Sequence, residues 1–597
     1  MKLKNILVIV AASSLLSACD DLFEPANENI RDLSAMQKEP SYASGILANA
    51  YILLPYSSSP TTDVATDDAV SNDNTNSYLK MATGSWSAEN DPTSQWVSRR
   101  NAIQYINLFL ENVDNVAWAT DANVKVMYAD RYKGEAYALR ALQNLYLLRA
   151  HAGYDADGNL LGVPILTHSE NASSDFNVPR NTFKECVDSI YADAKRALDL
   201  LPLDFKDISD DEIPAKYKAL GVTKASNYNR ADGDVAKGRI SGRITEAILA
   251  QTALLAASPA YNAGSGINYE EAANRAAVVL DRIGGVSGID PNGATWFSDS
   301  KAINNLANGD NTLEVLWRGG IDNSYSLETD NFPPSLYGKG RVNPTQNLVD
   351  AFPSLNGYPI NDPESGYTSS NPYASRDPRL DAYIVVNGST QGPDKSKIIT
   401  GVYGTTNDVI NKESGYSTRT GYYLRKLLRS DCNPNSNYKT SQKHVFPRIR
   451  YTEIFLDYAE AANEAYGPTG NGTHGYSAYD VIKAIRKRAG IGLENGDAYL
   501  ESIKDNKDKM RELIRNERRL ELCFENQRFY DLRRWKVELN KLNESAKGVQ
   551  IEQNAEGKLT FTPLNVEDRS YSDYMYYGPI PYSECLKWSN LKQNAGW

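Results

Sequence analysis

Apolar residues recur at helical spacing along much of the chain, and three of the helices that this spacing predicts end alike. Segments 135–154, 240–261 and 451–466 are rich in Ala, and each finishes on a Tyr preceded by Ala or Gly. An amphipathic segment lies before or after most of them. Because small residues let neighbouring helices approach closely, this pattern predicts a scaffold of packed helix pairs that bury a continuous core.

The same periodicity predicts the helices of this scaffold, and Thr182 and Pro202 are the expected cap and stop of one of them. The expected helices cover residues 101–118, 128–152, 183–201, 239–257, 269–283, 450–465, 476–489 and 498–525. Such pairs resemble tetratricopeptide units, although long inserts break the period. We therefore predict a mainly α fold, a tetratricopeptide-like scaffold of helical pairs with loop-rich inserts that carry short strands.

Two stretches have the composition of inserts. Residues 284–448 are rich in Gly, Asn, Asp, Ser, Pro and Tyr, and residues 63–91 are rich in Thr, Asn, Asp and Ser. Short strand-like pieces in the longer insert lie at 312–317, 380–386 and 422–426. Because loops on a rigid scaffold commonly carry binding residues, we expect the binding site in these inserts.

The first residues are typical of an export signal. Lys2 and Lys4 precede an apolar run over 6–16, which is shorter than the about 20 residues that span a membrane. We interpret residues 1–18 as a signal peptide that is removed. The sequence Leu-Ser-Ala before Cys19 resembles the lipobox of bacterial lipoproteins, so we expect lipid on Cys19. Two or three acyl chains would hold the protein at a membrane. A plain secretory peptide is the alternative.

Charge and residue content exclude several classes of ligand. The chain has a net charge of −11, which argues against nucleic acid or an anionic lipid surface as the ligand. The cysteines beyond Cys19 are far apart, so they show no metal-binding spacing and could be disulfides or free thiols. They are Cys186, Cys432, Cys523 and Cys585. The four His are not paired at helical spacing, and we predict neither a cofactor nor a metal.

Several segments follow one another in a fixed order along the mature chain. One is WVSRRNAIQYINLFLEN at 96–112, and another is RNERRLELCFENQRFYDLRRW at 515–535. The further segments are 134–164, 242–257, 344–360, 375–380, 448–464, 484–490 and 577–597. Together they resemble the SusD-like (RagB/SusD) family of outer-membrane nutrient-binding lipoproteins of Bacteroidetes. The segment at 448–464 matches the family's Arg-Tyr-Ala-Glu-type helix, with Thr452 in place of the usual Ala.

The resemblance implies a non-catalytic protein that covers a SusC-like TonB-dependent transporter and passes it an oligosaccharide, less often a peptide. It implies a single domain over 19–597. Its scaffold would cover about 40–283 and 449–535, its ligand-binding insert about 284–448 and its C-terminal segment 536–597. Asp20 and Asp21 resemble a surface-export signal, so we expect the anchored chain to face the cell exterior at the outer membrane.

Aromatic residues in the inserts are the best candidates for glycan contacts. Tyr outnumbers Phe by 38 to 13, and Tyr and Trp rings can stack on sugars while nearby polar groups bind hydroxyls. The resemblance implies that an Asp and a Trp of the first insert serve the ligand, although Trp86 could instead fill the edge of the scaffold. The candidates are Asp67, Asp68, Trp86, Asn90, Trp296, Tyr325 and Tyr337. We expect Trp96 and Trp317 in the core.

Other charged segments have simpler interpretations. The Glu and Arg residues of 511–534 recur at helical spacing, which favours a solvated lattice of ion pairs over an active site. The acidic run at 63–73 does not match a calcium loop. A glycoside hydrolase would need two carboxylates across a cleft, and the sequence has no recognisable hydrolase segment. A scaffold that binds other proteins is a third alternative.

Overall fold

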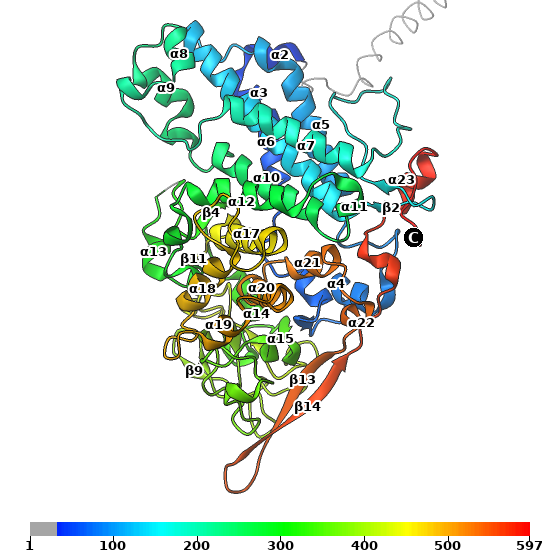
Figure 1. Ribbon diagram of the computed structural model, residues 1–597, viewed down its shortest axis with the longest axis vertical. Helices are drawn as coiled ribbons and strands as arrows, with labels where there is room; N and C mark the ends of the chain where they lie inside the picture. The colour runs from blue at the N-terminus through cyan, green and yellow to red at the C-terminus, as the bar shows by residue number, and fades with distance from the viewer. Residues whose placement is uncertain (1–32, 308) are drawn as a thin grey trace, which may run out of the picture.

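A computed structural model describes residues 33–307 and 309–597 of the chain. The fold is mainly helical with short two-stranded sheets, which confirms the predicted fold class. In Figure 1 the helical layers lie above and the loop-rich part below. Cys19 and the signal peptide lie outside the described residues. Within those residues, each helix is either too short or too polar to cross a membrane.

Four helix pairs form the scaffold in the described part of the chain. They are α3 (Pro40–Ile52) with α5 (Trp96–Asn112), α6 (Ala122–His151) with α7 (Phe183–Leu200), α10 (Gly242–Ala257) with α12 (Tyr269–Asp281), and α17 (Tyr451–Tyr466) with α18 (Ala478–Arg488). Helix α10 packs on both α6 and α7, and α12 packs on α17, so the pairs stack into one continuous core. The predicted helix pairs are therefore confirmed.

Local sequence explains how the α6–α7 pair forms. The Thr182 side chain accepts a hydrogen bond from the Glu185 amide in a capping box, and α7 ends before Pro202, as predicted. Arg140 of α6 makes two 2.7 Å bonds to the carboxylate of Asp193 on α7. A Cβ atom on Gly134 would lie 2.6 Å from the side chain of Leu201. The pair therefore needs a residue without a side chain at this crossing.

The prediction of one continuous helix over 498–525 is wrong. The structure has two helices there, α19 (Ala498–Ile503) and α20 (Lys507–Leu522). The Asn506 side chain accepts hydrogen bonds from the amides of Asp508 and Lys509, which caps a new helix. A cap inside a periodic segment interrupts the helix without changing its apolar spacing, so the periodicity did not reveal the break.

The two predicted inserts meet through backbone pairing. Strand β1 (Ala69–Ser71) of the first insert pairs antiparallel with β6 (Val342–Pro344) of the second. Strand β4 (Val315–Arg318) pairs with β12 (Pro447–Arg450), so the beginning and end of the long insert lie together. The other pairs are β7 (Ile384–Val385) with β10 (Tyr423–Leu424), β5 (Asn323–Ser324) with β11 (Gln442–Lys443), β8 (Thr390–Gln391) with β9 (Ser396–Lys397), and β2 (Gly153–Tyr154) with β3 (Leu160–Leu161).

One predicted strand is mostly a helix. Residues 378–383 form α16 (Pro378–Tyr383), and only β7 at the end of the predicted segment is extended. Asp377 caps this helix by accepting from the Arg379 amide, and Pro378 occupies its first position. Pro favours the first turn of a helix because its missing N–H is not needed there. The Asp-Pro pair was therefore a usable helix signal.

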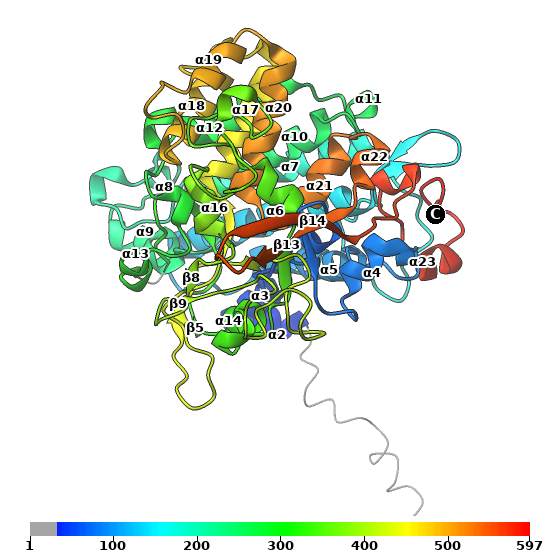
Figure 2. The same ribbon diagram turned by 90° about the horizontal axis from the view of Figure 1, so that it is seen from below.

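The hairpin of β13 (Ala546–Gln553) and β14 (Leu559–Glu567) was not predicted. It projects at the lower end of the molecule in Figure 1 and crosses the loop-rich face in Figure 2. Val549 and Ile551 alternate with more exposed residues, and Gly557 has a positive φ at the turn. That alternation around a Gly-containing turn is a hairpin signal.

Short helices complete the described chain. They are α2 (Leu33–Lys38), α4 (Ser77–Lys80), α8 (Ala215–Ala219), α9 (Ala225–Asp232), α11 (Asn262–Ser265), α13 (Ser300–Asn304), α14 (Ser326–Asn331), α15 (Gln346–Ala351), α21 (Arg528–Arg534), α22 (Leu539–Leu542) and α23 (Tyr582–Lys587).

Trp96 and Trp317 are buried, as expected. Of the two alternatives for the cysteines in the described chain, the structure has free thiols.

The ion pairs around α20 are buried, whereas the sequence analysis expected a solvated lattice. Glu517 and Glu521 have no exposed surface. Arg379, which belongs to the insert, reaches both of them at 2.9 Å and also bonds Asp377 at 2.7 Å. Arg450, at the end of β12, pairs with Glu314 at 2.6 Å. Charged residues at helical spacing indicate that ion pairs form. They do not indicate whether the pairs face solvent or the interior of the protein.

Replacing Arg379 with Met should lower the free energy of unfolding by about 3–5 kcal/mol, because it removes the positive partner of three buried carboxylates, those of Asp377, Glu517 and Glu521. Urea-induced unfolding followed by tryptophan fluorescence measures the change. The control is Lys184→Met, which breaks an exposed pair with Asp188 and should cost less than about 1 kcal/mol. Equal losses in the two variants would contradict a structural role for the buried pair.

Candidate functional site

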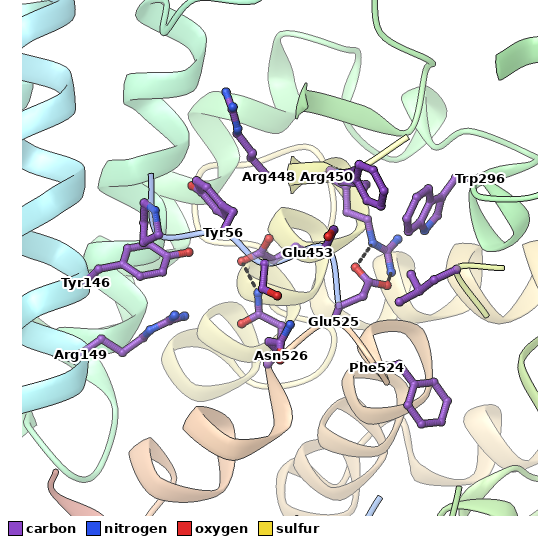
Figure 3. Close-up of a pocket in the computed structure, with 17 residues that line it drawn as sticks. Tyr56, Tyr146, Arg149, Trp296, Arg448, Arg450, Glu453, Phe524, Glu525 and Asn526 are labelled. Carbon is purple, nitrogen blue, oxygen red and sulfur yellow. Dashed lines mark hydrogen bonds and ion pairs between the residues drawn. The ribbon is translucent and has the colours of Figure 1, made fainter. Parts of the chain in front are cut away.

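A pocket of about 80 Å³ lies where the scaffold meets the long insert. Figure 3 shows Tyr56, Tyr146 and Arg149 on one side, Trp296 and Arg450 on the other, and Glu453 between them. This volume is far below the roughly 300–1,000 Å³ of typical ligand pockets. It has room for a few water molecules and not for an oligosaccharide. Trp296 is the predicted site residue that lines it, and its ring is buried.

Glu453 is the buried acid of this pocket. It accepts a 2.8 Å hydrogen bond from Gln251, and Gln527 lies at 3.5 Å. Burial and the neighbouring Asp457 raise the pKa of Glu453 to about 7, against the opposing charge of Arg518. Burial likewise raises the pKa of Asp457 to about 6. The pocket can hold a proton, but it is too small to place a glycosidic bond between two carboxylates.

Asp67 and Asp68 are held inside the protein. Asp67 bonds Arg528 at 2.9 Å, and Asp68 bonds Arg519 at 2.6 Å. Burial opposes ionisation of Asp67, but the guanidinium groups of Arg519 and Arg528 hold the pKa of this carboxyl well below its usual range. Carboxylates already paired and removed from solvent have little capacity for sugar hydroxyls, so their burial counts against the predicted ligand contact.

Trp86 fills the edge of the scaffold, which was the alternative to a ligand contact. Its indole N–H donates to Asp91 at 3.0 Å. Its ring packs edge-on against Phe529 and Trp597, with centroid distances of 5.7 and 4.9 Å. The side chain is buried. Asn90 is exposed in the same turn and donates to the carbonyl of Ser85.

Tyr325 and Tyr337 lie at opposite ends of the α14 segment in the long insert. Tyr325 precedes α14 and is half-buried, with the ammonium of Lys439 at 5.4 Å from its ring centroid. Tyr337 follows the short helix η10 (Pro334–Leu336), and its side chain is 61% exposed. These two predicted residues therefore belong to one short segment of the long insert, one before α14 and the other after η10.

Tyr416 joins this region, although the sequence analysis did not select it. Its side chain is 45% exposed. A Cβ atom on Gly340 would lie 2.7 Å from the Tyr416 carbonyl, so the turn after Tyr337 touches the segment that carries Tyr416. Arg341 donates to the carbonyl of Gly415 at 2.9 Å. A Tyr in a Tyr-rich loop has no sequence signal that separates it from the others.

We call this surface the tyrosine face and define it by Tyr325, Asp330, Tyr337, Lys339 and Tyr416. Asp330 and Lys339, from the same segment as Tyr337, form a partly exposed ion pair at 3.1 Å. The first insert supports the loop that carries Lys339, because the side chain of Asn72 donates to the carbonyl of Lys339 at 2.8 Å. The face thus combines aromatic rings with polar groups on a supported loop.

The raised pKa of Glu453 predicts a pH effect. Between the ordinary Glu value of 4.5 and about 7, the folded protein keeps a proton that the unfolded chain has lost, so this group's contribution to stability falls as pH rises. Glu453→Gln should therefore raise stability near pH 8, on the order of 1 kcal/mol, and do so less near pH 5. Thermal unfolding of both proteins at the two pH values measures this. An equal gain at both would contradict the shifted titration.

Comparisons with known proteins cover most of the chain. Residues 310–597 match the SusD family, and residues 37–221 match the family described as starch-binding associating with outer membrane. A SusD-like protein, P2, from Formosa agariphila is 28% identical over 176 residues, which are 29% of each chain.

Solved structures share the fold over nearly the whole length. A SusD-like protein from Bacteroides fragilis is 23% identical, with a TM-score of 0.71 over 96% of this chain and 100% of its own. A SusD-like carbohydrate-binding protein from the same species is 21% identical, with a TM-score of 0.68 over 94% and 100%. A laminarin-binding SusD-like protein is 18% identical, with a TM-score of 0.56 over 93% and 99%. The family matches over residues 37–221 and 310–597 together place this chain in the SusD family.

Proposed function

We propose that this protein is a surface-exposed lipoprotein that captures an oligosaccharide on the tyrosine face and delivers it to a SusC-like TonB-dependent transporter. The observation that carries the proposal is the exposed ring of Tyr337 in a loop that the rest of the insert supports. Family membership supports a binding protein rather than an enzyme. The carbohydrate-binding and laminarin-binding proteins of the same fold support a glycan as the ligand.

The backbone at Tyr337 supports a role for its ring. Its φ is +64°, in the left-handed region that a non-Gly residue adopts at a cost. The turn holds this conformation because the Tyr337 amide donates to the Pro334 carbonyl at 3.0 Å, and the Gly338 amide donates to the Pro333 carbonyl at 3.3 Å. An exposed ring contributes little to the core, so this turn leaves the ring of Tyr337 free to contact a ligand.

The chemistry of the face suits a glycan. Tyr337 and Tyr416 offer rings for the apolar faces of sugars, and their hydroxyls remain available for hydrogen bonds. Asp330 and Lys339 can exchange part of their exposed ion pair for bonds to sugar hydroxyls. An open surface of this kind can take a long chain that the small pocket at Glu453 could not admit. Asn90 and the buried Asp67, Asp68, Trp86 and Trp296 are not part of the proposed site.

Tyr337→Ala should weaken oligosaccharide binding about tenfold, because loss of an aromatic contact of roughly 1.4 kcal/mol corresponds to that factor. Isothermal titration calorimetry of the Cys19→Ser protein with laminarin-derived and starch-derived oligosaccharides and with short peptides identifies the ligand. The variant is then titrated with the best binder. Tyr416→Ala should act in the same direction.

The matched control is Tyr582→Ala. Its ring is 44% exposed but lies on α23, outside the tyrosine face. It should bind like the parent protein. Wild-type affinity in the Tyr337→Ala, Tyr416→Ala double variant would place the ligand elsewhere. Binding of peptides alone would replace the glycan in the proposal by a peptide.

The proposed anchor is Cys19, which lies outside the described residues. Cys19→Ala should abolish incorporation of labelled fatty acid and move the protein out of the outer-membrane fraction, because the acyl chains supply the membrane attachment. Labelling and fractionation measure the two effects, and a protease added to intact cells tests exposure on the outer surface. Undiminished labelling of the Cys19→Ala protein would refute lipid attachment at this residue.

A further inference from the structure

Three potential metal ligands meet at the base of the hairpin that the pairing of Asn433 with Thr440 closes. Glu328 is on α14, Cys432 precedes the hairpin and His444 follows β11. One ligand atom from each residue lies within 4.8 Å of the others, and all three side chains are buried. The residues are far apart in sequence, which is why spacing along the chain did not reveal them. The pairing of β5 with β11 brings their segments together.

The contacts of His444 require a positive species between it and Glu328. Its Nδ1 lies 2.9 Å from the carbonyl oxygen of Gln442, so Nδ1 must carry a hydrogen and donate. Its Nε2 lies 2.9 Å from Oε1 of Glu328, which also accepts when ionised. Two acceptors cannot face one another without a proton between them or a metal ion bound to both. The Nδ1 bond to a carbonyl is also the arrangement that orients a histidine for metal binding through Nε2.

The contacts of Glu328 are a second observation that favours a bound metal ion. Its Oε1 accepts a 2.7 Å bond from the amide of Arg429. Its other carboxylate oxygen, Oε2, is buried and has no hydrogen-bond partner among the described residues. A buried carboxylate oxygen without a partner is costly, and a metal ion would satisfy it. The Cys432 thiol lies beside this group, where its Sγ is 3.4 Å from the carbonyl oxygen of Ser324.

We propose that Glu328, Cys432 and His444 bind a zinc ion. One sulfur, one nitrogen and one oxygen ligand suit a borderline ion such as Zn²⁺. Tetrahedral coordination with bonds of about 2.0–2.3 Å leaves the fourth position for water or for the free oxygen of Glu328. Tetrahedral bonds of this length put the ligand atoms about 3.3–3.6 Å apart. The three atoms now lie within 4.8 Å of one another, so the sulfur must move inward, and Nε2 of His444 and Oε1 of Glu328 must move slightly apart from their 2.9 Å contact.

Binding would exchange protons for the metal. Burial, followed by the nearby Glu328, raises the pKa of the Cys432 thiol above its usual range, so without metal the sulfur keeps its proton. On binding, Zn²⁺ replaces the thiol proton and any proton between His444 and Glu328, and these protons pass to solvent. The ion would join α14 to both ends of the hairpin, directly beside Tyr325. The site does not depend on the proposed glycan function.

The test uses the Cys19→Ser protein, reduced and stripped of metal by a chelator, and titrated with Co²⁺ as a spectroscopic probe. We expect one equivalent to produce an intense near-ultraviolet band from a cobalt–thiolate bond together with visible bands, and Zn²⁺ to remove both. The Cys432→Ser and His444→Gln variants should lose at least tenfold in cobalt affinity, and Cys432→Ser should lose the thiolate band.

Cys585→Ser is the matched control, because Cys585 is the most accessible of the four free thiols in the described chain. It should keep the full signal and the same affinity. A thiolate band that persists in Cys432→Ser, or disappears in Cys585→Ser, would overturn the assignment. A wild-type protein without any thiolate band would show that a proton alone joins His444 to Glu328. Zinc should also raise the melting temperature of the wild type but not of Cys432→Ser.

Discussion

Charged side chains buried along α20 join the scaffold to the long insert. Removing an ion from water costs several kcal/mol, so each buried carboxylate must find a positive partner within the fold. The insert supplies Arg379, and α18 supplies Arg486, which bonds Glu517 at 2.8 Å. Arg518 of α20 in turn pairs with Asp457 of α17 at 2.6 Å. The scaffold and the insert are therefore joined electrostatically as well as by apolar packing.

This arrangement allows the surface loops to vary while their attachment stays fixed. The paired strands β4 and β12 join an early part of the insert to its end, and Arg450 at the end of β12 pairs with Glu314 and Glu525. Beyond these anchors, β1 and β6 join the two inserts and Asn72 supports the loop that carries Tyr337. A binding surface built on such loops can change its ligand without changing the fold.

The helical scaffold could be predicted because its signals are local. Apolar spacing located the helix pairs, and Thr182 marked the start of α7 at the correct residue. How deeply a residue is buried does not depend on its neighbours in the sequence alone. Asp67 and Trp86 have types suited to glycan contacts, but whether they face solvent depends on Arg528 and Trp597, which lie more than four hundred positions later in the chain. Tyr416 was missed for the same reason, because the turn after Tyr337 that lies beside it is distant from it in the sequence.

Hydrogen–deuterium exchange with and without saturating oligosaccharide can locate the ligand on the tyrosine face. A ligand bound there should slow exchange of backbone amides in peptides that cover residues 325–341 and 411–420, with little change in α6 and α10. Protection confined to the 85–91 turn or to the pocket around Glu453, with unchanged exchange on the tyrosine face, would contradict this placement of the ligand.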